Sequence, residues 1–417
     1  MIHMSTNKSN KPELRFKGFS DDWEQRKVGE LLSERIEQFP KSDEYPLMAF
    51  VANEGVAPKG DRYDRSALVN DTEGKLYKRT EFGDFIYSSN NLETGSIGLN
   101  KYGNATISSV YSIFRPTGIA DSDFIGRRFI RKDFINEMVK WRQGVIYGQW
   151  KIHEEDFLKI EVMVPSLEEQ RLIGSFLDNL DHLITLHQRK CDNLKIIKKS
   201  MLDNLFPKIG EKVPKWRFKG FNNDWEQRKL SEITTIHARI GWQNLRTSEF
   251  LDDGDYYLIT GTDIVEGRID FSNCHYVAKG RYDQDKSIQI NNGSILITKD
   301  GTLGKVAYVS GLNKPATLNA GVFNVVIKAD DIDGTYLYHY IDGPFLMDYV
   351  SKRATGGTIK HLNQSILVDF PVVLPSYEEQ KKIGETLQGL DSLITLHQSE
   401  VERLKKAKQF FLDKMFI

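Results

Sequence analysis

The stretch "DWEQRK" occupies residues 22–27 and returns letter for letter at residues 224–229. Its flanks agree as well, because "PELRFKGFSDDWEQRKVGEL" in the first copy matches "PKWRFKGFNNDWEQRKLSEI" in the second. A second pair of segments follows in the same order, "VPSLEEQRLIGSFLDNLDHLITLHQ" from residue 164 and "LPSYEEQKKIGETLQGLDSLITLHQ" from residue 374. Agreement at two separate places indicates a tandem duplication of one structural unit.

The bulk properties are those of an ordinary globular protein. A chain of 417 residues can form two to three domains, and its net charge of −1 gives no global positive field for nucleic acid, although local basic faces remain possible. The two cysteines, Cys191 and Cys274, lie in unrelated contexts, which predicts no disulfide framework and fits a reducing cytoplasm. No apolar run approaches the roughly 18 residues of a membrane span, so we expect no membrane partner.

The duplication predicts an α+β fold of two mixed α/β domains separated by a long antiparallel two-helix coiled coil with pseudo-twofold symmetry. In the second copy "YYLITGTDI", "GSILITKDGTLGKVAYVS" and "GVFNVVIKA" are β-rich runs broken by glycine-containing turns, and the first copy has similar runs. We call the two divergent α/β regions the first head and the second head. The predicted boundaries are a lead-in at 1–27, the first head at 28–165, a helix at 166–206, a linker that repeats the lead-in at 207–229, the second head at 230–375 and a helix at 376–417.

The two matched helices carry the most regular pattern. The first runs from Leu167 without a proline until Pro207, and apolar residues recur in both helices at heptad spacing. About 38 residues at roughly 1.5 Å each make a rod of about 57 Å, longer than one domain core requires. Matching faces favour an antiparallel pair with the heads at opposite ends, and the N-terminal lead-in is expected near the end of the second helix. The predicted seam is Ile173, Phe176, Leu180, Leu183, His187 and Leu194 with Ile383, Leu390, Leu393, His397 and Leu404.

Three local motifs could each have a specific function, but each also has a plain structural interpretation. His187 and His397 hold equivalent places, but neither has a Cys, Asp or Glu at ligand spacing, so we expect no metal site. The segment "KDGTLGKVA" at 299–307 resembles a phosphate loop but departs from its pattern at both ends, and a β-hairpin is the favoured interpretation. The basic segment 189–219 is either a solvated face or a surface that follows a phosphate backbone. No motif typical of a catalytic class is found.

At this point the order of motifs is recognisable. A lead-in, a variable α/β region, "PS-x-EEQ" and a long helix, repeated once, resemble the specificity subunit of type I restriction–modification systems over nearly the whole chain. The segments "GSILITKDGTLGKVAYV", "ATGGTIKHLN" and "LPSYEEQKKIG" look like the target-recognition domain of that family. The first head departs from it, with "SSNNLETGSIGLN" and "WRQGVIYGQWKI" in those places, so its DNA preference should differ.

The resemblance implies a chain that catalyses nothing itself within a DNA adenine methyltransferase and ATP-dependent endonuclease complex. Each head would read one half of an asymmetric, interrupted site in double-stranded DNA, and the helices would set the gap. Two methyltransferase subunits would dock on the equivalent repeats, and restriction subunits would join them. No cofactor is expected on this chain, whereas S-adenosylmethionine, ATP and Mg are expected on the partner subunits, in the cytoplasm.

Base edges are read by polar side chains on loops that face a groove. Matched to the family pattern, the candidates are Lys299, Asp300, Thr302, Lys305, Thr355, Thr358, Lys360, His361 and Asn363 in the second head, and Ser89, Asn90, Asn91, Arg142, Gln143, Tyr147, Gln149 and Lys151 in the first. Three alternatives remain open: a fused or stand-alone nuclease or methyltransferase, a coiled-coil adaptor whose heads bind peptides, and a stand-alone DNA-binding regulator.

Overall fold

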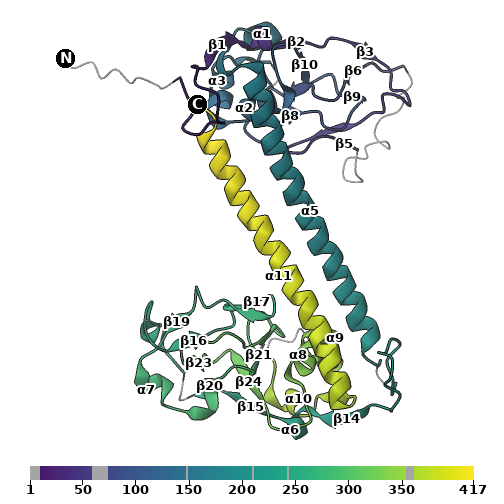
Figure 1. Ribbon diagram of the computed structural model, residues 1–417, viewed down its shortest axis with the longest axis vertical. Helices are drawn as coiled ribbons and strands as arrows, with labels where there is room; N and C mark the ends of the chain where they lie inside the picture. Colours follow the sequence, from purple (N-terminus) through teal and green to yellow (C-terminus); the bar gives the residue numbers. More distant parts are fainter. Residues whose placement is uncertain (1–9, 59–73, 147–148, 209–210, 242–243, 354–360) are drawn as a thin grey trace, which may run out of the picture. The chain divides into compact units, whose positions relative to one another are not determined.

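The structure, a computed structural model, describes residues 10–58, 74–146, 149–208, 211–241, 244–353 and 361–417. It divides into two compact units, residues 1–187 with 399–417 and residues 188–398. The first unit holds the first head with one half of α5 (Leu167–Leu205) and one half of α11 (Tyr377–Lys414). The second unit holds the second head with the other half of each helix (Figure 1). Each unit therefore contains part of both long helices.

The first head is built on two small antiparallel sheets. The larger has the order β2-β10-β7-β8, formed by Leu32–Glu34, Ser112–Pro116, Phe85–Tyr87 and Ile97–Leu99. The smaller has the order β3-β6-β9, formed by Gln38–Phe39, Tyr77–Thr80 and Ala105–Ile107. The remaining elements are β1 (Glu24–Lys27), α1 (Val28–Leu31), β4 (Ala49–Val51), β5 (Gly55–Ala57), α2 (Ser122–Phe129), α3 (Lys132–Lys140), β11 (Gln143–Ile146), β12 (Gln149–Lys151), α4 (Glu154–Phe157) and β13 (Glu161–Val164).

The second head repeats this plan, and its second sheet has four strands where the first head has three. Its main sheet is antiparallel with the order β15-β24-β21-β22, formed by Thr234–Ala238, Val322–Ile327, Ile295–Thr298 and Val306–Tyr308. A second sheet has the order β19-β16-β23-β20, formed by His275–Tyr276, Tyr257–Ile259, Ala316–Leu318 and Gln289–Ile290. The remaining elements are β14 (Glu226–Lys229), α6 (Leu230–Ile233), η4 (Thr247–Glu249), β17 (Ile264–Val265), β18 (Arg268–Ile269), α7 (Lys279–Tyr282), η5 (Lys286–Ile288), α8 (Gly334–Asp342), α9 (Pro344–Arg353), α10 (Gln364–Val368) and β25 (Pro371–Leu374).

An aromatic core fixes each head against the start of its long helix. In the first unit Phe114 packs on Phe157 with ring centroids 4.7 Å apart, and Ile173 of α5 is buried in the same cluster. In the second unit Phe206 packs on Tyr336 at 5.4 Å, and Ile383 of α11 is buried in that cluster. Burying large rings supplies most of the driving force for such short strands, which are marginal on their own.

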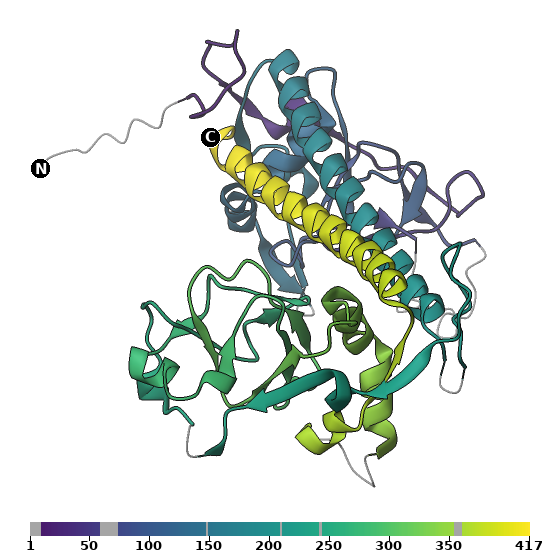
Figure 2. The same ribbon diagram turned by 60° about the horizontal axis from the view of Figure 1, so that its bottom comes forward.

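The long helices pair antiparallel in each unit. In the first unit Lys408 of α11 forms an ion pair with Asp181 of α5, close to a ring contact between Phe411 and Phe176. In the second unit the equivalent ion pair joins Lys198 of α5 to Asp391 of α11 at 2.7 Å. Figures 1 and 2 show the helices side by side from two directions. The predicted fold class of two mixed α/β domains with an antiparallel helix pair is confirmed.

The predicted seam is wrong at two leucines. Leu183 and Leu393 are 40% and 45% exposed, and their neighbours Ile184 and Ile394 are turned inward instead. The inward residues follow the first heptad position by four rather than three, as the buried Leu177 and Leu387 follow Ile173 and Ile383. The other predicted seam positions are buried or partly buried: Ile173, Phe176, Leu180, His187, Leu194, Ile383, Leu390, His397 and Leu404.

Each lead-in closes on the end of a long helix. The Leu14 amide donates to the Lys414 carbonyl at 2.8 Å, and the Trp216 amide donates to the Asn204 carbonyl at 2.9 Å. These two contacts occupy equivalent places in the repeat. The expected packing of the N-terminal lead-in near the end of the second helix is therefore confirmed within the first unit.

Candidate nucleic-acid interface

In the second head, the first candidate loop is the turn between β21 and β22. The two strands pair antiparallel, and the Thr298 amide donates to the Lys305 carbonyl at 2.9 Å. Gly301 and Gly304 have φ of 71° and 74°, a left-handed conformation that glycine adopts at little cost. The hairpin interpretation of this segment is confirmed, and the turn presents Thr302 and Lys305 as exposed side chains.

A second candidate loop, just before α10, is bonded to the first. The Leu362 amide donates to the Lys299 carbonyl at 2.9 Å, and the exposed His361 ring lies 2.5 Å from the Asp300 carboxylate, measured from Nδ1 to Oδ1. Asn363 is exposed beside them. The structure thus brings together the six second-head candidates that it describes. Thr355, Thr358 and Lys360 lie outside the described residues.

The first head joins its two loops at equivalent positions with different chemistry. The Ser89 hydroxyl accepts a hydrogen bond from the Ile152 amide at 3.0 Å, and these residues correspond to Lys299 and Leu362. The Asn90 side-chain oxygen accepts one from the Trp150 amide at 2.6 Å. In the first head, side-chain oxygens accept the hydrogen bonds that join the two loops, whereas in the second head a backbone carbonyl accepts the joining hydrogen bond.

Arg142 is held inside the first-head site. Its guanidinium makes two hydrogen bonds to the Glu93 carboxylate, at 2.9 and 2.7 Å, and a third to the Ser89 carbonyl at 3.1 Å. The hydrogen bond from Arg142 lowers the pKa of Glu93, so the carboxylate stays charged. The Arg142 side chain is only 11% exposed. We therefore interpret Arg142 as stabilising the loop and not as contacting a ligand.

The other first-head candidates differ in the exposure of their side chains and in their hydrogen bonds within the protein. Asn91 and Lys151 are exposed, whereas the exposed Gln143 already donates to Asp156 at 2.8 Å. Tyr147 lies outside the described residues, as does the side chain of Gln149. Two members of this site are absent from the residues expected from sequence: Glu93, which holds Arg142, and Trp150, whose indole is 45% exposed beside Lys151.

Two cations of the second-head site lie against the protein without a carboxylate partner among the described ion pairs. The Lys299 ammonium lies 5.4 Å from the centroid of the Phe323 ring, and the Lys305 ammonium donates to the Ile264 carbonyl at 3.4 Å. Both therefore keep positive charge near the exposed turn. Lysine ammonium groups placed in this way can donate hydrogen bonds to phosphate oxygens and to the acceptor atoms of base edges.

The Lys198 side chain, by contrast, is held in an ion pair within the protein. Its side chain is 16% exposed and pairs with Asp391, so this member of the basic segment does not follow a phosphate backbone. Among the residues with described positions, no three His, Cys, Asp or Glu side chains are grouped to hold a metal ion. No helix in the described ranges is long and apolar enough to span a membrane.

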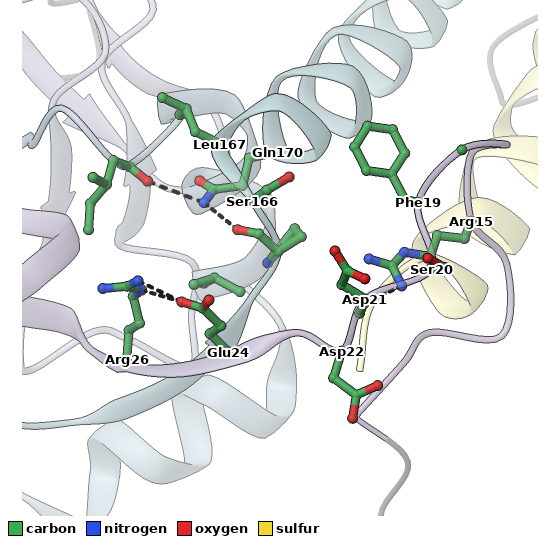
Figure 3. A pocket seen from close by; sticks show the side chains of 14 residues that line it. Arg15, Phe19, Ser20, Asp21, Asp22, Glu24, Arg26, Ser166, Leu167 and Gln170 are labelled. Atoms are coloured by element: carbon green, nitrogen blue, oxygen red, sulfur yellow. Dashed lines mark hydrogen bonds and ion pairs between the residues drawn. The ribbon is translucent and has the colours of Figure 1, made fainter.

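A pocket of about 290 Å³ lies away from the candidate loops, between the lead-in and the start of α5 (Figure 3). Arg15, Asp21, Asp22 and Glu24 line it, together with Gln170 from the helix. The arginines at its wall, Arg15 and Arg26, are already ion-paired with Glu169 and with Glu24 and Glu30, so the pocket is a poor candidate for contact with DNA.

Comparisons with known proteins agree with this architecture. The sequence matches the family model of the type I restriction modification DNA specificity domain twice, over residues 20–195 and 222–406. The MjaVIII specificity subunit of Methanocaldococcus jannaschii, a type I restriction enzyme subunit, is 22% identical over 94% of this chain and 92% of its own length. The MjaIX specificity subunit of the same organism is 27% identical over 46% of this chain and 44% of its own length.

A solved structure of a type I restriction–modification S subunit from M. genitalium shares the fold. Its TM-score is 0.58 with 16% sequence identity, over 98% of this chain and 99% of that one. The two family matches cover both copies of the repeat, each with its lead-in strand, head and long helix. The chain therefore belongs to the family of type I restriction–modification DNA specificity proteins.

Proposed function

We propose that this chain is the DNA-reading subunit of a type I restriction–modification complex and catalyses no reaction itself. Each head reads one half of an asymmetric, interrupted site in double-stranded DNA. One observation carries the proposal: the two heads have equivalent frames, but the loops joined at Ser89 and Ile152 differ in chemistry from those joined at Lys299 and Leu362. A duplicated frame with unlike loops suits two different half-sites.

Reading would follow the donor and acceptor pattern of base edges. Lysine donates to guanine acceptors, asparagine pairs with adenine, and threonine contacts either a polar edge or a thymine methyl group. The second head offers Lys299, Thr302, Lys305 and Asn363, while the first offers Asn91 and Lys151 beside Trp150. Because these sets differ, the two half-sites need not be related by symmetry.

In this proposal the helix pair sets the distance between the half-sites. The 39 residues of α5 correspond to a rod of about 58 Å at roughly 1.5 Å per residue. Ion pairs of Asp181 with Lys408 and of Lys198 with Asp391 fix the register of the two helices in the respective units. A fixed register suits a spacer of fixed length.

Two methyltransferase subunits would dock on equivalent surfaces, and restriction subunits would join that assembly. Leu183 and Leu186 on α5 are exposed, as are Leu393 and Leu396 on α11, and all four lie in the identical segment "LITLHQ". Two like apolar surfaces fit two copies of one partner. S-adenosylmethionine, ATP and Mg belong to those partners in this proposal, and this chain binds none of them.

The test is to express the chain with its methyltransferase partner and to map methylated adenines by sequencing. One bipartite motif with two unlike halves is expected. Replacing the second-head loops, residues 299–305 with 361–363, should change one half of the motif and leave the other half and the gap intact. Methylation without sequence preference, or a change in both halves, would contradict the proposal.

A further inference from the structure

Two non-glycine residues in the described ranges have a left-handed backbone, and both lie in hairpin turns. Asn53 has a φ of 63° between β4 and β5, and Glu266 has a φ of 47° between β17 and β18. Such conformations persist where the surrounding structure fixes them, often at functional sites. We call residues 88–96 the first reading loop and residues 299–305 the second reading loop. We infer that Asn53 and Glu266 are positioning residues, each holding the reading loop of its own head in the geometry that selects bases.

The inference rests on the proposed function, because it concerns the loops that we assign to base reading. The two hairpins occupy corresponding places in the repeat. Leu47, just before β4, pairs in parallel with Thr106 of β9, and β16, just before β17, pairs in parallel with β23. In both heads the strand pair that carries the reading loop comes later in the chain, β7–β8 in the first and β21–β22 in the second.

Turn chemistry alone does not account for the residue at 266. Glu266 and Gly267 form a two-residue turn in which both φ values are positive, 47° and 80°. The first position of such a turn favours asparagine, aspartate or glycine, and glutamate is not among these residues. The contacts of the Glu266 side chain are therefore the reason to examine for its presence.

In the first head, Asn53 lies directly on the first reading loop. Its backbone amide donates to the Gly95 carbonyl at 3.0 Å, and a Cβ on Gly95 would lie 2.3 Å from the Asn53 Oδ1 atom. The loop is closed by hydrogen bonds from the Ser88 amide to the Ser96 carbonyl at 2.8 Å and from the Ser96 amide to the Asn91 carbonyl at 2.9 Å. A displacement of Gly95 would therefore reach Asn91, an exposed candidate for base reading.

The hairpin β4–β5 is itself fixed in the first head. Phe50 and Val56 are buried in one small cluster with Ile86 of β7. At the turn, a Cβ on Gly55 would lie 2.6 Å from the Leu99 carbonyl oxygen, so the backbone of the turn rests directly on β8. A hairpin anchored in this way can hold the loop that leans on it.

In the second head, the hairpin β17–β18 contacts the end of the second reading loop and the strand that follows. The Lys305 ammonium donates to the Ile264 carbonyl at 3.4 Å, and the Tyr308 amide donates to the Gly267 carbonyl at 3.1 Å. Ile264 is buried in the core of this head. The hairpin therefore determines where the Lys305 side chain, a candidate for base reading, is held.

Glu266 ties this hairpin to α11. Its Oε1 atom accepts a hydrogen bond from the Gln398 Nε2 atom at 2.9 Å, within the second unit. The turn also rests on α8, since a Cβ on Gly267 would lie 2.0 Å from the Tyr338 hydroxyl. Loss of the Glu266 carboxylate would free the turn from α11 and would loosen the carbonyl that holds Lys305.

A positioning role has a signature that a purely structural role lacks. Hydrogen bonds to base edges weaken steeply when donor and acceptor are misaligned, whereas the attraction to phosphates depends little on exact geometry. Glycine adopts a left-handed backbone at little cost, so a glycine at either position should preserve the turn while it removes the side-chain contact. We therefore expect lost discrimination between bases without lost stability.

The test uses the full chain with its methyltransferase partner and duplexes that carry the motif found by mapping methylated adenines. Affinity is measured for this motif and for duplexes with one base pair changed in either half. Asn53→Gly should reduce discrimination at least about fivefold in the half read by the first head, and Glu266→Gly should do so in the other half. Each variant is the control for the half that it should leave unchanged. Replacement of the second-head loops identifies which half belongs to which head.

Conservative variants separate the side-chain contact from the mere change of residue. Asn53→Asp keeps the shape of the side chain and Glu266→Gln keeps the acceptor for Gln398, so both should discriminate as wild type does. Thermal unfolding of the glycine variants should occur close to the wild-type temperature. Glycine variants that discriminate as wild type does would overturn the inference, and so would lost discrimination in both halves together with lower stability. A wild-type complex that binds all duplexes alike would instead refute the proposed function, and the inference with it.

Discussion

Arg15 holds the carboxylate of Glu169 through two hydrogen bonds, from Nε to Oε1 at 2.6 Å and from Nη2 to Oε2 at 2.7 Å. Glu169 is fully buried at the start of α5, and Arg15 reaches it from the lead-in. The second unit repeats the pair as Arg217 and Glu379, with both distances at 2.8 Å. The same paired charges thus tie each lead-in to the start of a long helix.

Removing the Arg15 guanidinium should destabilise the protein strongly. Arg15→Met leaves a buried carboxylate without its counter-charge, which typically costs about 3 kcal/mol or more. The loss should appear as a lower free energy of unfolding in urea. Arg403→Met is a suitable control, because the exposed pair of Arg403 with Glu400 should contribute less than about 1 kcal/mol. Equal stability of the two variants would show that the Arg15 pair is dispensable.

Two glycines of α11 should respond to alanine with opposite signs. A Cβ on Gly384 would lie 2.2 Å from the Thr335 hydroxyl and 2.7 Å from the Tyr336 amide, because α8 begins against the helix there. A Cβ on Gly389 would meet nothing within 4 Å. Gly389→Ala should stabilise by up to about 1 kcal/mol through helix propensity.

Gly384→Ala should destabilise instead, by about 1–3 kcal/mol, because its methyl group must displace the first turn of α8. Thermal unfolding of the two single variants under one set of conditions decides the sign of each change. A stabilised Gly384→Ala variant would mean that α8 moves away from α11 at little cost.

His339 should make the second unit sensitive to acid. Burial, with a smaller contribution from the nearby Lys198 charge, lowers the pKa of His339 from 6.5 to about 3. Two carboxylates lie nearby, since Asp391 of α11 is 3.8 Å from the His339 Nδ1 atom and Asp342 of α8 is 3.7 Å from the Lys198 ammonium. Because the unfolded chain takes up a proton near pH 6.5 and the folded chain does not, stability present above pH 6.5 is lost as the pH falls toward 3.

At pH 5.5 the loss due to His339 should be about 1.4 kcal/mol. His339→Met removes the titrating ring, so the difference in unfolding free energy between pH 7.5 and 5.5 should shrink by that amount in the variant. Comparing the two proteins cancels the other titrating groups. The same pH dependence in both would show that the ring is protonated in the folded protein.

The sequence predicts the repeated parts of this molecule better than the parts that differ. The identity of the two lead-ins predicts where Leu14 and Trp216 are bonded, since one closed frame must accommodate both copies. The hairpin at Gly301 and Gly304 also follows from sequence, because its turn chemistry is local. The inward position of Ile184 does not, since Leu183 and Ile184 are both apolar and only the packing of the helix decides which of them turns inward.

In the candidate site, too, the sequence indicates some features and leaves others open. Polar residues such as Asn90 and Arg142 could be selected from sequence as loop residues, but their partners could not. Glu93 and the amide of Trp150 come from segments whose approach is set by tertiary packing. A polar side chain on a loop can read a ligand or hold the loop, and only its neighbours distinguish the two.

Lys305 provides the sharpest test of DNA reading in the second head. Its ammonium lies near the Ile264 carbonyl at the base of the exposed turn, and no carboxylate neutralises it among the described ion pairs. With the methyltransferase partner present, Lys305→Ala should weaken binding to the cognate duplex by about 1 kcal/mol or more, which is roughly fivefold. A loss confined to the cognate sequence indicates a base contact, whereas an equal loss on random DNA with a shallower salt dependence indicates a phosphate contact. Lys328→Ala, an exposed lysine bonded to the Ser231 carbonyl, is the control and should bind as wild type does. Unchanged affinity of a folded Lys305→Ala protein at moderate salt would remove this residue from the interface.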